Sequence, residues 1–521
     1  MTFNHLKNNL ILPASVALVF MQPGLKAQDK KETGEKTEKR GPNIVYVFPD
    51  QYRKQAMGFW GEKPFKGALN TKADPVYTPN LNNFARQSLV LTSAVSNTPV
   101  SSAHRGSLFT GFYPSRSGVP LNCNATRPIS SLPQEIVCYT DILKQQGYQT
   151  GYIGKWHLDY PTPNNPEKPG TYVEERWPAW DAYTPAEKRH GFDYWYSYGT
   201  RDIHKDPRYF DSNGQAHRPC VFSAQHDADK AIEFIKQKAT GNNGQPFALF
   251  VAMNPPHHPY SSLEDCMEED LNLYNQKGIN ELLVRENADT KLSKAASTPY
   301  YFANITAIDR EFGRILDALK ETGLDENTIV VFTSDHGETM CSHGLEDAKN
   351  TIYSEAFDVP FIIRWPQKLK PGLSKAILST PDILPTIIGL AGLEAELPNN
   401  RHGFNYAKTL TGQSKQNPRS ALYIKNVDGN KDANGLVTDY FPVSRGVKTD
   451  RYTLSLSITK EKKIQKILLF DHKNDPYELN NLAFDPSSKM AKDLLKELAF
   501  WLKHSEDPWF AEKILENIIP Y

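Results

Sequence analysis

Short apolar runs alternate with amphipathic helical patterns from residue 42 to about residue 410, and this alternation constrains the fold more than any other feature. Three of the runs, at residues 44–48, 247–251 and 328–332, are typical of buried strands. Helical periodicity covers residues 227–238 and 300–321, and Gly323 ends the second pattern. Strands that alternate with helices predict an α/β domain in which a large central sheet is sandwiched by helices.

Polar side chains follow each of these three strands directly. Asp50 comes after the first strand, residues 254–258 come after the second, and Asp335 comes after the third. In open α/β sheets, ligands collect at the carboxyl ends of the strands. We therefore expect these segments to share one site.

The chain has 521 residues, a length that suits one large domain and a smaller one. After Gln413 the pattern changes to short strands at residues 422–424, 452–457 and 466–470, followed by a helix at 487–504. We predict a catalytic domain at residues 42–412 and a smaller C-terminal α+β subdomain at residues 413–521.

The N-terminal residues are typical of an export signal. Lys7 precedes an apolar run at residues 10–21, which is too short to span a bilayer comfortably, and Ala27 offers a cleavage point. We predict a signal peptide at residues 1–27 and a charged, disordered linker at residues 28–41. With no later membrane span in the sequence, we expect a protein that is exported to the bacterial periplasm without stable membrane insertion.

Composition excludes some functions. Lys plus Arg and Asp plus Glu each number 60, so the balanced charge offers no field for nucleic acid. The five cysteines are widely spaced and form no C-x-x-C pair, so neither a zinc site nor a disulfide framework follows from them.

Residues 101–111 read as a loop that enters a helix. Ser101 begins this segment, Arg105 follows one turn later, and Gly111 ends it. A hydroxyl at a helix N-terminus with an arginine on the next turn is placed to meet an anion. Alone, the segment would more often be an ordinary serine N-cap.

Two strand ends carry side chains that suit a metal ion. Asp50 and Gln51 end the first strand, and Asp335 and His336 follow the third. Carboxylate and amide oxygens favour calcium, whereas the imidazole also suits manganese or zinc. Each pair alone is a weak signal, since Asp-His-Gly is common in turns.

Three further motifs carry basic groups. Lys155 and His157, in the run Gly-Lys-Trp-His-Leu, emerge on one side of a short strand because residues two apart share a face. His257 and His258 lie in a proline-stiffened loop, which suits a general acid held in place. Lys349 precedes Tyr-Ser-Glu and Val-Pro. Solvated surface residues would be the ordinary explanation for each motif taken alone.

Together these six segments, in this order, resemble the type I sulfatases of the alkaline phosphatase superfamily, and residues 468–482 resemble the C-terminal subdomain of that family. In those enzymes the first residue of C/S-x-P/A-x-R is oxidised to formylglycine, whose hydrate is the nucleophile. Ser101 and Ala103 stand at the first and third positions here, so the chain resembles the serine-type variant. The resemblance implies a mixed central sheet and a radical S-adenosylmethionine maturase as partner.

The resemblance also implies roles for individual residues. One calcium ion would be held by Asp50, Gln51, modified Ser101, Asp335 and His336. Arg105, Lys155 and Lys349 would hold the sulfate oxygens, His257 would protonate the leaving alcohol, and His157 would help to expel sulfate. Many relatives carry Asp where this chain has Gln51 and Asn where it has His336. His258 is the alternative to His257.

We expect an exo-acting carbohydrate sulfatase, and two other readings stay open. One is a phosphonate monoester or phosphodiester hydrolase of the same superfamily; the other is a non-catalytic glycan-binding protein. Residues 161–219 hold side chains that could either contact a glycan or pack the domain: Trp177, Trp180, Arg201, His204 and Arg208.

Overall fold

The computed structural model describes residues 41–175, 179–241, 244–346, 348–416 and 418–518. The predicted signal peptide, nearly all of the predicted linker, and Trp177 lie outside these ranges. The signal peptide, the linker and the glycan contact of Trp177 therefore stay predictions.

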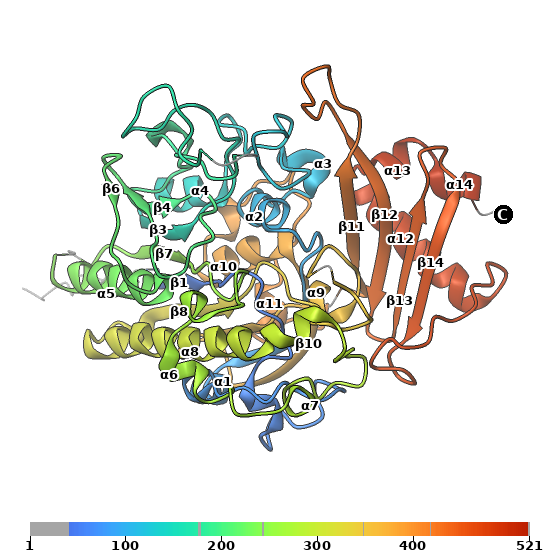
Figure 1. Cartoon of the computed structure of the whole chain (residues 1–521), viewed down its shortest axis with the longest axis horizontal. Coiled ribbons are helices and arrows are strands. Elements are labelled where there is room, and N and C mark those ends of the chain that lie inside the picture. Colours follow the sequence, from blue (N-terminus) through green and yellow to red (C-terminus); the bar gives the residue numbers. More distant parts are fainter. Residues whose placement is uncertain (1–40, 176–178, 242–243, 347, 417, 519–521) are drawn as a thin grey trace, which may run out of the picture. The chain divides into compact units, whose positions relative to one another are not determined.

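A ten-stranded mixed sheet forms the centre of the large domain (Figure 1). Its order is β10-β2-β9-β8-β1-β7-β3-β4-β5-β6. The strands are β1 (Asn43–Val47), β2 (Leu89–Val95), β3 (Gln149–Lys155), β4 (Tyr194–Tyr198), β5 (Tyr209–Asp211), β6 (Ala216–His217), β7 (Phe247–Ala252), β8 (Thr328–Thr333), β9 (Phe361–Arg364) and β10 (Gly372–Ser379). The five strands from β8 to β4 run parallel, while β9, β5 and β6 pair antiparallel with their neighbours. The predicted fold class is confirmed.

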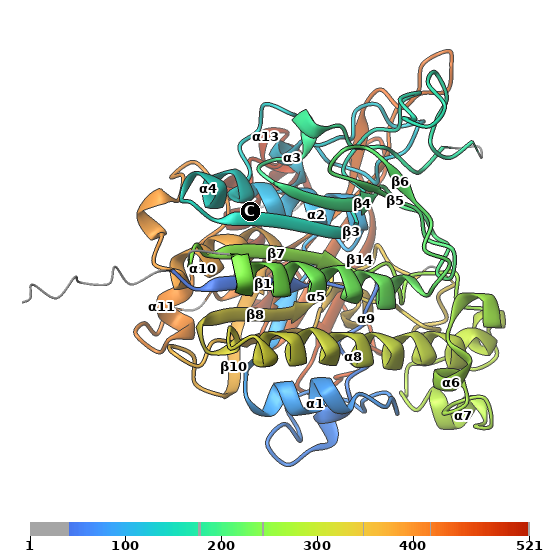
Figure 2. The same ribbon diagram turned by 90° about the vertical axis from the view of Figure 1, so that its left-hand side faces the viewer.

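Helices cover both faces of this sheet. The α-helices of the large domain are α1 (Pro79–Arg86), α2 (Ser101–Thr110), α3 (Pro114–Ser117), α4 (Tyr139–Gln145), α5 (Ser223–Gly241), α6 (Glu268–Leu271), α7 (Ile279–Leu282), α8 (Thr298–Glu321), α9 (Ser354–Phe357), α10 (Ile383–Leu390) and α11 (Ala407–Leu410). Helices α1, α5 and α8 pack on one face and α2, α4, α10 and α11 on the other. Figure 2 shows α5 and α8 running along the near side of the strands.

The central strands are apolar throughout because both of their faces are covered. Along β1, Ile44 and Tyr46 contact the core on one side, whereas Val45 and Val47 contact the core on the other. Such continuous apolar runs are expected of buried parallel strands, unlike the alternating pattern of half-exposed ones. For this reason the ends of the strands predicted from sequence agree with those of β1, β7 and β8 to within one residue.

The C-terminal part is an antiparallel four-stranded sheet covered by a helix (Figure 1). Its elements are β11 (Ser420–Asp428), β12 (Tyr440–Thr449), β13 (Tyr452–Ile458), β14 (Ile464–Asp471), α12 (Lys489–His504), α13 (Pro508–Ala511) and α14 (Ile514–Ile518). Ser488 caps α12, its Oγ accepting from the amide of Ala491 at 3.1 Å. The predicted α+β character is confirmed, and the domain boundary at Gln413 stays a prediction.

Candidate active site

Most of the site residues predicted from sequence meet at the carboxyl ends of the central parallel strands. They are Asp50 and Gln51 after β1, Ser101 and Arg105 in α2, Lys155 at the end of β3, His257 after β7, Asp335 and His336 after β8, and Lys349 before α9. Parallel neighbours end at the same edge of a sheet, so residues up to 298 positions apart in the sequence make contact there. The topology thus assembles the cluster that the sequence predicted.

Three potential metal ligands lie at the centre. One ligand atom from each of Asp50, Asp335 and His336 lies within 4.8 Å of the others, and all three side chains are fully buried. His336 donates from Nδ1 to the Gly337 carbonyl at 3.0 Å, which leaves the lone pair of Nε2 on the side of Asp50. Burial lowers the pKa of His336 and so favours the neutral ring that a metal requires. These residues fit a divalent cation.

Ser101 stands directly beside this group. Its Oγ lies 3.2 Å from Nε2 of His336 and 3.4 Å from Oδ1 of Asp50. Ser101 is the first residue of α2 and is 1% exposed. A reactive group on residue 101 would therefore adjoin a bound cation.

The amide of Gln51 is oriented by Glu338, a residue to which sequence reasoning gave no role. Nε2 of Gln51 donates to the Glu338 carboxylate, which also accepts from Lys294 at 2.7 Å and from the Tyr260 hydroxyl at 2.8 Å. Oε1 of Gln51 is thereby turned the other way, where it accepts from Lys349 at 3.1 Å. In the sequence, this contact is indicated by a second carboxylate, Glu338, three residues after Asp335.

Arg105 forms hydrogen bonds with both central carboxylates, those of Asp50 and Asp335. Nη2 donates to Asp335 at 3.0 Å and to Asp50 at 3.3 Å, while Nη1 donates to the Lys155 carbonyl at 2.6 Å. Burial opposes its charge, but the neighbouring Asp335 raises the pKa of Arg105 above its usual value. The structure shows this arginine holding the carboxylates of Asp50 and Asp335, which are potential metal ligands, and its direct contact with sulfate stays a prediction.

Two lysines present positive charge to the same site. Nζ of Lys155 lies 2.9 Å from Oδ2 of Asp50. Nζ of Lys349 donates to Nε2 of His257 at 2.9 Å. The pKa of Asp50 would rise through burial alone, but Lys155 and the other basic groups nearby hold it well below its usual value. The carboxylate is thus ionised and available as a ligand.

His257, rather than His258, faces the cluster. Nδ1 of His257 donates to the His258 carbonyl at 2.8 Å, and its Nε2 meets Lys349. His257 is 4% exposed, whereas His258 is exposed to solvent, its ring lying against the His257 ring with centroids 4.1 Å apart. The geometry favours the histidine chosen from sequence as the proton donor.

Comparison with known proteins identifies the family. The family model for sulfatases matches residues 42–393, and the model for the C-terminal part of N-sulphoglucosamine sulphohydrolase matches residues 341–504. The chain belongs to the sulfatase family. It is a sulfuric ester hydrolase, in a family whose members are generally metal-dependent.

Relatives span nearly the whole sulfatase. An endo-4-O-sulfatase of Bacteroides thetaiotaomicron is 52% identical over 507 residues, which are 96% of this chain and 99% of the relative. An ulvan-active sulfatase of Formosa agariphila is 32% identical over 90% of this chain and 83% of its own. A solved structure, described with the metabolism of multiple glycosaminoglycans by Bacteroides thetaiotaomicron, has a TM-score of 0.91 at 52% identity and covers 92% of this chain and 100% of that one.

His157 of this sulfatase is buried and oriented by a hydrogen bond to the backbone. Nε2 donates to the Cys123 carbonyl at 3.1 Å, and the buried Nδ1 has no hydrogen-bond partner among the described residues. Burial and the charge of Lys155 lower the pKa of His157 to about 3. The ring is therefore neutral at pH 7, and its assistance in expelling sulfate stays a prediction.

The residues proposed for glycan contact, which lie before α5, fall into two groups according to their burial and contacts. His204 and Arg208 are buried: His204 donates to the His257 carbonyl at 2.8 Å, and Arg208 pairs with Asp181 at 2.7 Å. Arg201 pairs with Asp206 at 3.4 Å, and the ring of Trp180 lies 6.2 Å from that of His157. Packing explains the first two, which leaves Trp180 and Arg201 as glycan candidates in this sulfatase.

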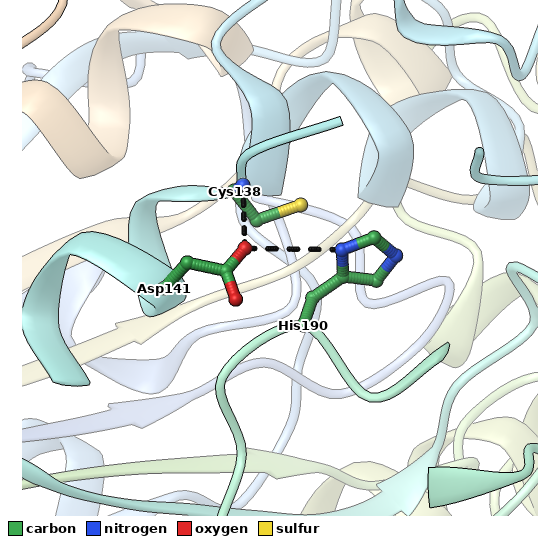
Figure 3. Close-up of side chains that lie close together, drawn as sticks. All are labelled: Cys138, Asp141 and His190. Atoms are coloured by element: carbon green, nitrogen blue, oxygen red, sulfur yellow. Dashed lines mark hydrogen bonds and ion pairs between the residues drawn. The ribbon is translucent and has the colours of Figure 1, made fainter. Parts of the chain in front are cut away.

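A further group of ligand-type side chains consists of Cys138, Asp141 and His190 (Figure 3). Asp141 accepts from the amide of Cys138 at 2.8 Å, and the Cys138 side chain faces the amide of Asp141 in a capping box at the start of α4. His190 lies 3.8 Å from the Asp141 carboxylate. Helix capping accounts for the positions of Cys138 and Asp141. All five cysteines of the sulfatase are free of disulfide bonds.

Proposed function

We propose that this sulfatase hydrolyses 4-O-sulfate esters within a glycosaminoglycan-like carbohydrate, using a formylglycine made from Ser101 and one calcium ion. The observation that carries the proposal is the buried contact of Ser101 with Asp50 and His336, beside Lys155. The relative at 52% identity is named an endo-4-O-sulfatase. For that reason we propose endo action in place of the exo action expected from sequence.

Calcium would be held by Asp50, Gln51, Asp335 and His336 together with residue 101. The proposal rests on the mainly oxygen donor set and on full burial of the ligands. When bound, a divalent cation supplies positive charge beside residue 101 and the sulfate oxygens. Manganese or zinc are the alternatives that His336 leaves open.

Residue 101 is proposed to be oxidised by a radical S-adenosylmethionine maturase. Support comes from the Ser-x-Ala-x-Arg run and from the position of Ser101 against the ligand group. An unmodified serine that attacked sulfur would be left as a stable sulfate ester, whereas a hydrated aldehyde has a second hydroxyl through which sulfate can leave. Modification therefore decides whether the enzyme turns over.

The surrounding residues have separable tasks. Lys155 and Lys349 balance the charge that develops on the sulfate oxygens. Arg105 keeps Asp50 and Asp335 in place through its hydrogen bonds. His257 gives a proton to the departing sugar oxygen, which would otherwise leave as a poor alkoxide.

Export to the periplasm is also proposed, on the strength of the apolar run at residues 10–21. Among the described residues, no helix is long and apolar enough to cross a membrane. Mass spectrometry of the protein from a secreting host would show removal of about residues 1–27, and an uncleaved N-terminus would refute the signal peptide.

The deciding experiment measures sulfate release from chondroitin oligosaccharides that differ only in the ester position. We expect release from internal 4-O-sulfated residues, dependence on calcium, and a mass at residue 101 that corresponds to formylglycine. Phosphonate and phosphate esters turned over faster than sulfate esters would favour the alternative hydrolase. An intact serine with no turnover of any ester would favour the glycan-binding protein.

A further inference from the structure

Asp202, which sequence reasoning did not single out, contacts the histidine assigned as proton donor. It lies in the loop after β4, and its Oδ1 is 3.4 Å from Nδ1 of His257 and 3.7 Å from Nζ of Lys155. Oδ1 also accepts from Nδ2 of Asn254 at 3.3 Å. The side chain of Asp202 is 33% exposed, so it lines the edge of the site rather than its core.

Two further hydrogen bonds join the loop of Asp202 to the loop of His257. Nε2 of His204 donates to the His257 carbonyl at 2.8 Å, and Nδ2 of Asn254 donates to the Arg201 carbonyl at 3.3 Å. The two loops are thus connected on both sides of the Asp202–His257 contact. This fixes the carboxylate relative to the imidazole.

The protonation of His257 explains why a carboxylate is needed there. Nδ1 carries a proton, because its partner at 2.8 Å is a carbonyl oxygen, and Nε2 accepts from the Lys349 ammonium. A general acid must carry a second proton, on Nε2. Burial and the charges of Lys155 and Lys349 hold the pKa of His257 well below its usual value, while Asp202 acts in the opposite direction.

We infer that Asp202 is a positioning residue that orients His257 and stabilises the doubly protonated ring from which the departing sugar oxygen takes its proton. This inference rests on the proposed role of His257. As the oxygen on residue 101 bonds to sulfur, the bond between sulfur and the sugar oxygen breaks. The released electron pair takes the proton from Nε2, and His257 returns to its neutral Nδ1–H form.

The test compares two substrates in the mature enzyme with calcium. Asp202→Asn keeps the shape of the side chain and removes its charge. We expect kcat/KM to fall about 10- to 100-fold for a 4-O-sulfated oligosaccharide, but less than about threefold for 4-nitrophenyl sulfate, whose leaving group needs little protonation. Asp202→Glu should recover part of the loss on the sugar ester.

Asp193→Asn is the matched control. Asp193 directly precedes β4, at the end opposite to Asp202, and it pairs with Lys144 on the surface. This variant should keep wild-type rates on both substrates. Equal losses for Asp202→Asn on the two substrates, or a sugar rate within twofold of wild type, would overturn the inference. Absence of sulfate release by the wild type would instead refute the proposed function.

Discussion

Replacing Glu338 by glutamine should weaken binding of the proposed calcium ion, although none of the proposed metal ligands is replaced. One carboxylate oxygen of Glu338 accepts from Gln51 and Tyr260, and the other accepts from Lys294 and the Met340 amide. A glutamine has only one oxygen to offer. If its NH2 group faces Gln51, two donors meet, and the Gln51 amide must rotate so that its nitrogen faces the metal site.

The magnitude follows from these contacts. A donor left without an acceptor in a buried site costs about 1–3 kcal/mol. Loss of an outer partner of a ligand typically lowers metal affinity about 10- to 100-fold, which corresponds to about 1.4–2.8 kcal/mol. Removal of the charge also leaves Lys294, which is 14% exposed, without its ionic partner. We therefore expect lower stability in addition to weaker calcium binding.

Calorimetric titration of calcium into chelator-treated protein measures the affinity, and thermal melting with and without calcium measures stability. Lys294→Gln is the matched control, because it removes the same ion pair but leaves the carboxylate to hold Gln51. That variant should lose stability and keep the wild-type calcium Kd. A wild-type Kd in Glu338→Gln, or an equal loss in both variants, would refute the reasoning.

Three other outcomes are expected. His257→Ala should lower kcat/KM on a sugar sulfate about 10²- to 10³-fold and on 4-nitrophenyl sulfate less than tenfold, whereas His258→Ala should differ little from wild type; the reverse ranking would make His258 the acid. Gly154 has a φ of +94°, and a Cβ there would lie 2.2 Å from a carbonyl oxygen of β7, whereas Gly147 has a φ of +81° and open space around it. Melting curves should therefore show a larger loss of stability for Gly154→Ala than for Gly147→Ala, whose cost should be about 1 kcal/mol. Burial raises the pKa of Asp382 to about 7 from 3.8. The protonated carboxyl of Asp382 therefore contributes its full stabilisation below about pH 4, and this contribution is lost as the pH rises through 7. The melting temperature of the wild type should fall relative to that of Asp382→Asn between these pH values. Melting temperatures of the two proteins that change equally with pH would contradict this assignment.

Elements whose signal is local could be predicted from sequence. The apolar runs of β1, β7 and β8 and the periodicity of α8 depend on burial along a single segment, so no partner needs to be known. β12 was not predicted, because Pro442, Arg445 and Gly446 interrupt its pattern. Only in the folded subdomain does Arg445 meet Asp507 at 2.7 Å, which lets a charged residue occupy a buried strand position.

The sequence by itself determined the family, the fold class and the set of chemically active residue types, since motif order and strand ends are properties of the chain. The tertiary structure decided which groups meet. It placed Arg105 on carboxylates, His204 behind His257, Glu338 against Gln51, and Asp202 beside His257, the proposed proton donor. The physical reason is that these contacts join loops between 53 and 287 residues apart. Their pairing depends on strand order and loop packing, which local periodicity does not encode.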